Sequence, residues 1–114
     1  MTHEQPPSQE FSGPERELIG RLREKGPEDP EVRASLVRWY DVAGEEARRP
    51  EGNRSRAEIE VQLRLAKIYR AAGGFDSASD ALEAVRFGAM NDPTAHDLYN
   101  QAMALMDEID AERG

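Results

Sequence analysis

Five helix-start signals punctuate the sequence, and they constrain its fold more than any other feature. Residues 12–15 (SGPE) and 55–58 (SRAE) both fit the Ser-x-x-Glu capping box, whose two side chains satisfy backbone amides at a helix N-terminus. Residues 29–30 and 92–93 are both Asp-Pro, which places an N-cap acceptor before a proline at the first helical position. The fifth start lies at Asp76. Each signal predicts the beginning of a separate helix.

A stop signal follows each of the first four starts. These signals are Gly26-Pro27, Pro50 to Gly52, Gly73-Gly74 and Asn91. Starts and stops together predict helices over residues 14–25, 30–49, 55–72, 77–90 and 93–111. No interval between them leaves room for a sheet. The sequence therefore predicts an all-α fold of about five antiparallel helices.

The first half of residues 56–76, RAEIEVQLRLAKIYRAAGGFD, alternates between apolar and polar side chains as a strand does. No glycine or proline separates the alternating part from Ile68 and Tyr69, however, and a capping box precedes it. We therefore predict one helix that is apolar on two sides. Such a helix is expected to pack between neighbours on both sides.

The chain is predicted to form one domain with a short tail. Residues 1–12 combine Pro, Gln and Ser with a single large apolar residue, Phe11, and are expected to be a flexible N-terminal tail. Residues 13–114 are expected to be a single helical domain, as suits their length. The predicted helix 14–25 offers few apolar side chains, Leu18, Ile19 and Leu22, so it is expected to be the least firmly docked.

The chain is acidic, with a formal net charge of −8. Residues 71–114 hold nine acidic and two basic side chains, a net charge of −7. Such a surface repels phosphate backbones, so nucleic-acid binding is disfavoured, whereas a basic partner would be attracted. Cysteine is absent, and we expect neither a signal peptide nor a membrane span, because the longest apolar run is only residues 102–106. We expect a cytoplasmic protein.

Side chains that could carry chemistry are sparse. His3 and His96 form no spaced pair, and the acidic residues 107–112 lack the glycine turn and ligand spacing of a calcium loop. The glycines at residues 20–26 and 73–74 do not follow the order of a phosphate-binding loop. We therefore expect no enzymatic activity, no cofactor and no metal.

Two further features leave alternatives open. The loop region 48–56 carries a basic cluster: Arg48, Arg49, Arg54 and Arg56. This cluster either meets phosphate, or complements the negative end of the preceding helix and pairs locally with Glu45, Glu51 or Glu58. Trp39 either packs under the helix 14–25 or belongs to an exposed contact patch.

Residues 62–93 resemble a tetratricopeptide repeat, a helix-turn-helix unit. The likeness is carried by LAKIYRAAGGFDSASDAL, in which residues 65–66 fill the Leu-Gly positions, Tyr69 the tyrosine, residues 73–74 the turn, Ala78 the small position and Leu82 the aromatic position. The sequence departs from the pattern at Gln62, Val85 and Met90, where the family has Trp, Ala and Pro. A weaker copy, LVRWYDVAG, begins at residue 36, which is 29 residues upstream of the matching LAKIYRAAG.

The resemblance implies a protein-interaction module that binds a peptide or helix of a partner protein. In this family the first helix of each repeat lines the concave, ligand-binding side. Carried over, that side comprises Glu60, Leu63, Lys67 and Arg70, then Glu31, Ala34, Arg38 and Asp41, then Asp97, Asn100, Ala104 and Asp107. The residues expected to bind the partner are Arg38, Leu63, Lys67, Arg70 and Asn100.

Three of these residues carry a more specific expectation. Lys67 and Arg70 share one helix face, and with Arg38 they are expected to form an exposed basic strip for an acidic or C-terminal segment of the partner. Two alternatives remain. One is a helical bundle that self-associates as a homo-oligomer, and the other is a nucleic-acid binder that uses the arginine loop, residues 48–56.

Overall fold

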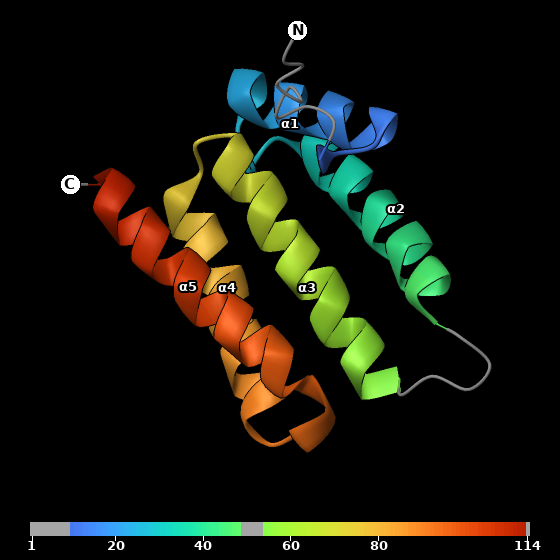
Figure 1. The fold of residues 1–114 in the computed structure, drawn as a ribbon. Helices are drawn as coiled ribbons and strands as arrows, with labels where there is room; N and C mark the ends of the chain where they lie inside the picture. The colour runs from blue at the N-terminus through green and yellow to red at the C-terminus, as the bar shows by residue number, and fades with distance from the viewer. Residues whose placement is uncertain (1–9, 49–53, 114) are drawn as a thin grey trace, which may run out of the picture.

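The computed structural model describes residues 10–48 and 54–113 of the 114-residue chain. These residues form α1 (Gly13–Lys25), α2 (Pro30–Ala47), α3 (Arg54–Ala71), α4 (Phe75–Met90), the 3₁₀ turn η2 (Pro93–Ala95) and α5 (His96–Arg113) (Figure 1). No strand occurs among them. The all-α prediction is confirmed, and each α-helix begins within three residues of its predicted start.

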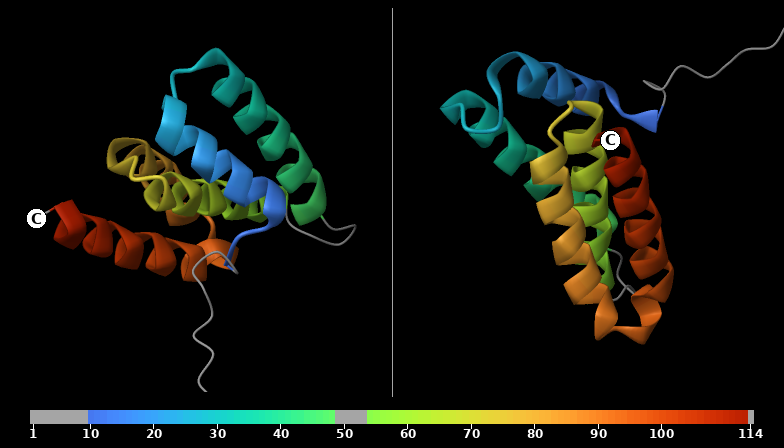
Figure 2. Two further views of the ribbon diagram at one scale, coloured as in Figure 1. Left: turned by 90° about the horizontal axis from the view of Figure 1, so that it is seen from above. Right: turned by 90° about the vertical axis from the view of Figure 1, so that its left-hand side faces the viewer.

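The helices are arranged around α3. In Figure 1, α2 to α5 alternate in direction along the chain, whereas α1 lies across the upper ends of α2 and α3. In the right-hand view of Figure 2, α4 and α5 run along α3 to either side of it, and α1 and the start of α2 lie at its upper end. α1 is therefore not antiparallel to its neighbours but crosses them.

Three of the helix starts follow the predicted capping chemistry. At α1, the Ser12 hydroxyl accepts a hydrogen bond from the Glu15 amide, and the Glu15 carboxylate accepts one from the Ser12 amide. Asp29 accepts hydrogen bonds from two amides of the first turn of α2. Asp92 accepts one from the Thr94 amide at the entry to η2 and α5.

The other two starts differ from the prediction. α3 begins at Arg54, so Ser55 lies inside the first turn and is not the N-cap residue. α4 begins at Phe75, with Gly74 as an N-cap that makes no side-chain hydrogen bond. Asp76 lies in the first turn of α4 instead, where its carboxylate complements the positive end of the helix dipole.

Two hydrophobic cores meet at α3. Ile59, Leu63 and Ala66 belong to a core shared with α4 and α5. Ile68 belongs to a second core, with Leu18, Ile19 and Leu22 of α1 and Val32 of α2. The half-buried Tyr69 packs against both. The apolar residues of α3 thus face two cores on different sides of the helix, which confirms the prediction that α3 is packed between neighbours.

The hairpin of α3 and α4 is held together by close contact. Ala66 and Ala78 are fully buried. At Gly88 a Cβ atom would lie 3.1 Å from the Ile59 side chain, so the two helices approach closely there. Gly73 leaves α3 with a φ of 80°, the left-handed exit expected of this turn. Small residues therefore set the distance between these two helices.

The N-terminal boundary lies earlier than predicted. Phe11 packs against the core of α1 and α2, and the Arg64 guanidinium lies 5.0 Å from the centre of its ring. Residues 10–12 thus belong to the folded domain, while the rest of the predicted tail lies outside the described residues. None of the described helices combines the length and apolarity needed to cross a bilayer.

Candidate partner-binding surface

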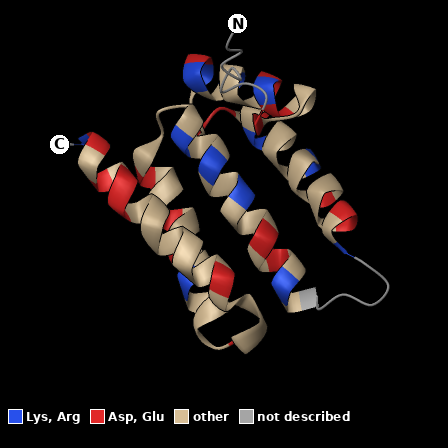
Figure 3. Cartoon of the chain, in the orientation of Figure 1, with Lys and Arg blue, Asp and Glu red and all other residues tan. Residues whose placement is uncertain are grey.

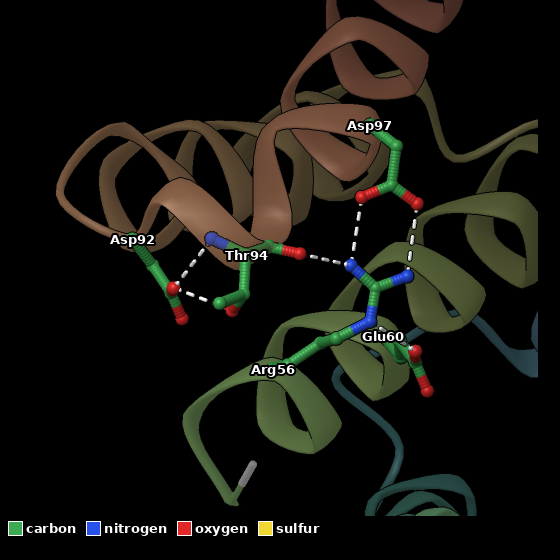
Figure 4. Close-up of polar contacts among 5 residues, drawn as sticks. All are labelled: Arg56, Glu60, Asp92, Thr94 and Asp97. Carbon is green, nitrogen blue, oxygen red and sulfur yellow. Dashed lines mark hydrogen bonds and ion pairs between the residues drawn. The ribbon is translucent and has the colours of Figure 1, made fainter. Parts of the chain in front are cut away.

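Basic positions recur along α3, and acidic positions recur on α5 beside it (Figure 3). Near the N-terminal end of α3, Arg56 forms a bidentate ion pair with Asp97: Nη1 lies 2.7 Å from Oδ1 and Nη2 lies 2.8 Å from Oδ2. The same guanidinium donates to Glu60 and to the Thr94 carbonyl (Figure 4). One side chain of α3 thus holds the start of α5.

This contact shifts the titration of Asp97. Hydrogen bonds from Arg56 lower the pKa of the Asp97 carboxyl from 3.8 to about 2. Nearby, Asp92 Oδ1 accepts hydrogen bonds from the Thr94 amide at 3.0 Å and the Thr94 hydroxyl at 2.6 Å (Figure 4). The entry to α5 is therefore fixed by one ion pair and one cap.

Arg70 holds the other end of α5. Its Nη2 lies 2.6 Å from a carboxylate oxygen of Glu112 and 3.1 Å from one of Glu108. The hydrogen bonds from Arg70 lower the pKa of Glu112. Arg113 of α5 in turn pairs with Asp76 at 2.6 Å, at the start of α4. Arg70 is thus engaged in joining helices, contrary to the expectation of an exposed strip.

The remaining expected site residues on α3 and α5 differ in their exposure. Leu63 is only 4% exposed and belongs to the core with α4 and α5, so it does not lie on an open face. The reason is its spacing from Ile59, which places both on the same core-facing side of α3. Lys67 is partly exposed, and it forms no ion pair within the described part of the chain. Asn100 is exposed on α5.

Arg38 lies in a different place from Lys67 and Arg70. It lines a groove between α1 and α2, whereas Arg70 is paired with α5. Figure 1 shows α3 between α5 and α2, so these cations belong to two separate surfaces. The predicted strip of three cations is therefore not formed. Sequence periodicity placed each residue on its helix face, but it did not determine how α2 sits against α3.

The groove between α1 and α2 consists of two adjoining hollows. The first, of about 380 Å³, is lined by Pro14, Glu17, Leu18, Arg21, Ser35, Arg38, Trp39 and Val42. The second, of about 590 Å³, is lined by Arg21, Glu24, Lys25, Glu31, Val32, Ala34, Ser35 and Arg38. Arg21, Ser35 and Arg38 line both hollows, so this trio sits where they meet.

Two guanidinium groups converge on one hydroxyl at this point. Ser35 Oγ accepts a hydrogen bond from Arg21 Nη1 at 3.0 Å and another from Arg38 Nη2 at 3.3 Å. Neither arginine forms an ion pair within residues 10–48 and 54–113. Two positive charges thus share a neutral acceptor.

Trp39 also contacts a buried carboxylate, that of Glu15. Glu15 accepts hydrogen bonds from Trp39 Nε1 at 3.1 Å and from Arg64 Nε and Nη2 at 3.1 and 2.6 Å. Burial raises the pKa of Glu15, but the hydrogen bonds and charge of Arg64 outweigh it, and the pKa is lowered. Trp39 is therefore packed against α1, as the first alternative expected, and its partly exposed side lines the groove.

The role of Arg64 was not predicted from the sequence. Its partner Glu15 lies 49 residues away, and no local pattern links the two positions. The capping box did single out Glu15, but as a helix cap alone. Only the crossing of α1 over α3 brings the carboxylate to the guanidinium.

The arginine loop is partly described. Arg48 pairs with Glu45 at 3.3 Å, as one alternative expected. Arg56 pairs with Glu60 and with Asp97 across helices. Arg49 and the side chain of Arg54 lie outside the described residues, so the structure does not place the whole cluster.

Histidine and carboxylate positions show no arrangement for metal binding in the described ranges. His96 is exposed and stacks on Tyr99, with ring centres 6.4 Å apart. His3 is outside those ranges. No group of three or more metal-ligating side chains comes together in residues 10–48 and 54–113.

Comparison with known proteins found no match: no family model, no curated protein and no solved structure is significantly similar to this chain.

Proposed function

We propose that this protein is a tetratricopeptide-like interaction module that binds a peptide or helix of a partner protein. The observation that carries the proposal is the groove between α1 and α2. Its apolar lining includes Leu18, Trp39 and Val42, and Val42 is 57% exposed. An apolar surface with a few convergent polar groups is the usual character of a binding site.

The α3–α4 hairpin supports the tetratricopeptide part of the proposal. Its close contact at Ala66 and Ala78 is what the resemblance implies for the small positions of a repeat. The departures at Gln62 and Met90 remain, so the likeness is one of pattern over a single hairpin.

A protein partner is favoured over nucleic acid. The formal net charge of −8 opposes approach to a phosphate backbone. The described cations of the arginine loop are also engaged, since Arg48 pairs with Glu45, and Arg56 pairs with Glu60 and Asp97. These pairs reduce the positive field that nucleic acid would require.

Site-specific crosslinking in the native cell tests this function. A photoreactive amino acid at Val42, in the groove, is expected to capture a partner protein. The same group at Asp80, which is exposed on α4, serves as the matched control. Capture of no protein from either site, or of the same proteins equally from both, would contradict the proposal.

Self-association is a second candidate, and one observation favours it. Phe87 and Met90 of α4 are 58% and 55% exposed, and their spacing of three residues places them on one helix face. Exposed apolar side chains next to each other are a common feature of contact surfaces.

A further inference from the structure

We propose that the groove between α1 and α2 recognises an acidic, amphipathic segment of a partner protein. A side-chain carboxylate of that segment lies between Arg21 and Arg38, and an adjacent apolar side chain packs against Trp39. This inference rests on the proposed interaction function and adds the site and the chemistry of the partner.

The arginine pair provides the electrostatic part of the argument. Both guanidinium groups donate to Ser35 Oγ, at 3.0 and 3.3 Å, so they are held close together with no carboxylate between them. Bringing two positive charges together is unfavourable, and an anion placed between them removes that cost. Guanidinium groups also match the planar carboxylate with paired hydrogen bonds. The convergence therefore favours a carboxylate ligand.

The apolar lining provides the second part. Pro14, Leu18, Trp39 and Val42 line the same hollow as the two arginines. Its volume of about 380 Å³ lies within the range of ligand pockets, about 300–1,000 Å³. A carboxylate at the arginine pair thus has room for an apolar neighbour beside the indole, and burial of that neighbour adds affinity that charge alone does not give.

The charges around the groove argue against a multiply charged ligand. Glu17, Glu24 and Glu31 line the two hollows beside the arginines. These carboxylates repel a phosphate group or a polyanion more strongly than a single carboxylate. The molecule as a whole is also acidic, with a formal net charge of −8. The geometry therefore selects an isolated carboxylate set among apolar residues.

Selection from a displayed library of random peptides, carried out on the full chain, tests this inference. Selected peptides are expected to be enriched in Asp or Glu next to Leu, Ile or Phe. Trp39 is the single tryptophan of the chain, so binding of a synthetic selected peptide is expected to change the intrinsic fluorescence of the protein. The change reports contact at the groove itself.

Charge-neutral variants identify the contacts. Arg21→Gln combined with Arg38→Gln is expected to weaken binding of the selected peptide roughly tenfold or more, about 1.4 kcal/mol. Arg33→Gln, on the exposed part of α2 but not among the groove-lining residues, removes a positive charge at another site of the same helix and is expected to leave affinity unchanged. Melting temperatures of the variants establish that each remains folded.

Several outcomes would overturn the inference. Selection of no peptide, or of basic or uncharged peptides, would reject the acidic partner. Equal affinity of the double variant and the wild type for the peptide would show that the arginine pair is not the binding site. Tighter binding of a phosphoserine version of the peptide would show that a carboxylate is not the preferred ligand. The interaction function is tested separately by crosslinking, and it fails if neither Val42 nor Asp80 captures a protein or if both capture the same proteins equally. Peptides of another chemistry that still alter Trp39 fluorescence would leave that function standing while this inference falls.

Discussion

Glu15 illustrates how one residue serves two levels of structure. Its carboxylate completes the capping box of α1 and also accepts hydrogen bonds from Arg64 and Trp39. The cap is local and follows from the sequence pattern. The contact with Arg64 depends on how α1 crosses α3, which no short-range pattern encodes. Local chemistry was therefore predictable at this residue, and the tertiary contact was not.

We expect Glu15→Gln to destabilise the fold by about 1–3 kcal/mol at neutral pH, because it weakens charge-assisted hydrogen bonds to a buried group. The pKa of Glu15 is lowered in the folded state from its ordinary value of 4.5, so this stabilisation is fully present above that value and is lost as the pH falls from it through the lowered pKa. Urea unfolding at pH 7 and pH 3 measures both effects. The matched control is Glu17→Gln on the exposed side of α1, with an effect within about 0.5 kcal/mol. A Glu15 effect as small as the control would contradict this account.

Leu82 provides a test of the core. It is fully buried between helices, so Leu82→Ala is expected to cost about 2–5 kcal/mol in the free energy of unfolding. His96→Ala removes an exposed side chain and should cost under about 0.5 kcal/mol. Denaturant melts of the two variants measure the difference. Equal, small effects would mean that the α3–α4 hairpin is not packed as described.

At the scale of the element, α3 shows which sequence signals prevailed. Its first half alternates like a strand, yet it is a helix whose apolar residues are divided between two cores. Continuity of the helix-forming run outweighed the alternation, and the sequence predicted this. The capping residues of α3 and α4 were less predictable, because Ser55 and Asp76 both fall within the first turn.

Chemical shifts provide a direct check of α3. Residues 57–65 are expected to show helical carbon shifts, and slow amide exchange is expected where the side chains are buried, at Ile59 and Leu63. The carbon shifts and amide exchange of residues 10–12, which precede α1, provide the comparison for those of α3. Extended-type shifts over residues 57–65 would contradict the fold.

Arg70 and Lys67, which the sequence places on one face of α3, differ in their contacts: Arg70 pairs with α5, and Lys67 forms no ion pair within the described residues. Arg70→Glu would place a negative charge beside Glu108 and Glu112 and is expected to lower stability by about 1 kcal/mol, because the contact is partly exposed. Lys67→Glu should change it by less than about 0.5 kcal/mol. Thermal melts at low and high salt measure both, and the Arg70 effect should shrink with salt. If both variants melted alike, Arg70 would not be joining the helices.

At the scale of the molecule, the sequence predicted the helices but not how they are arranged. Capping and periodicity act over a few residues, so the helix bounds followed from them closely. The crossing of α1 and the separation of Arg38 from Arg70 both depend on contacts between distant segments. For this reason the expected basic strip was wrong, and the groove that holds Arg38 was not foreseen.

The charge distribution leads to a prediction about self-association. Residues 71–114 carry a net charge of −7, and Phe87 and Met90 are exposed within this acidic part. Two copies that met through these side chains would bring their acidic surfaces together, a repulsion that low salt leaves largely unscreened. We therefore expect sedimentation at low salt to show a monomer of 12.8 kDa, unchanged in Phe87→Ser.

High salt makes the same experiment discriminating, since the Debye length falls to about 3 Å at 1 M and the repulsion is removed. If α4 is not a contact surface, the molecule stays monomeric there too. A dimer that appears at high salt, is abolished by Phe87→Ser and survives Val37→Ser, a matched change at another exposed apolar residue, would instead establish α4 as a self-association surface. Because the groove lies between α1 and α2, such a dimer would leave it open, so binding of the acidic peptide should persist in both states.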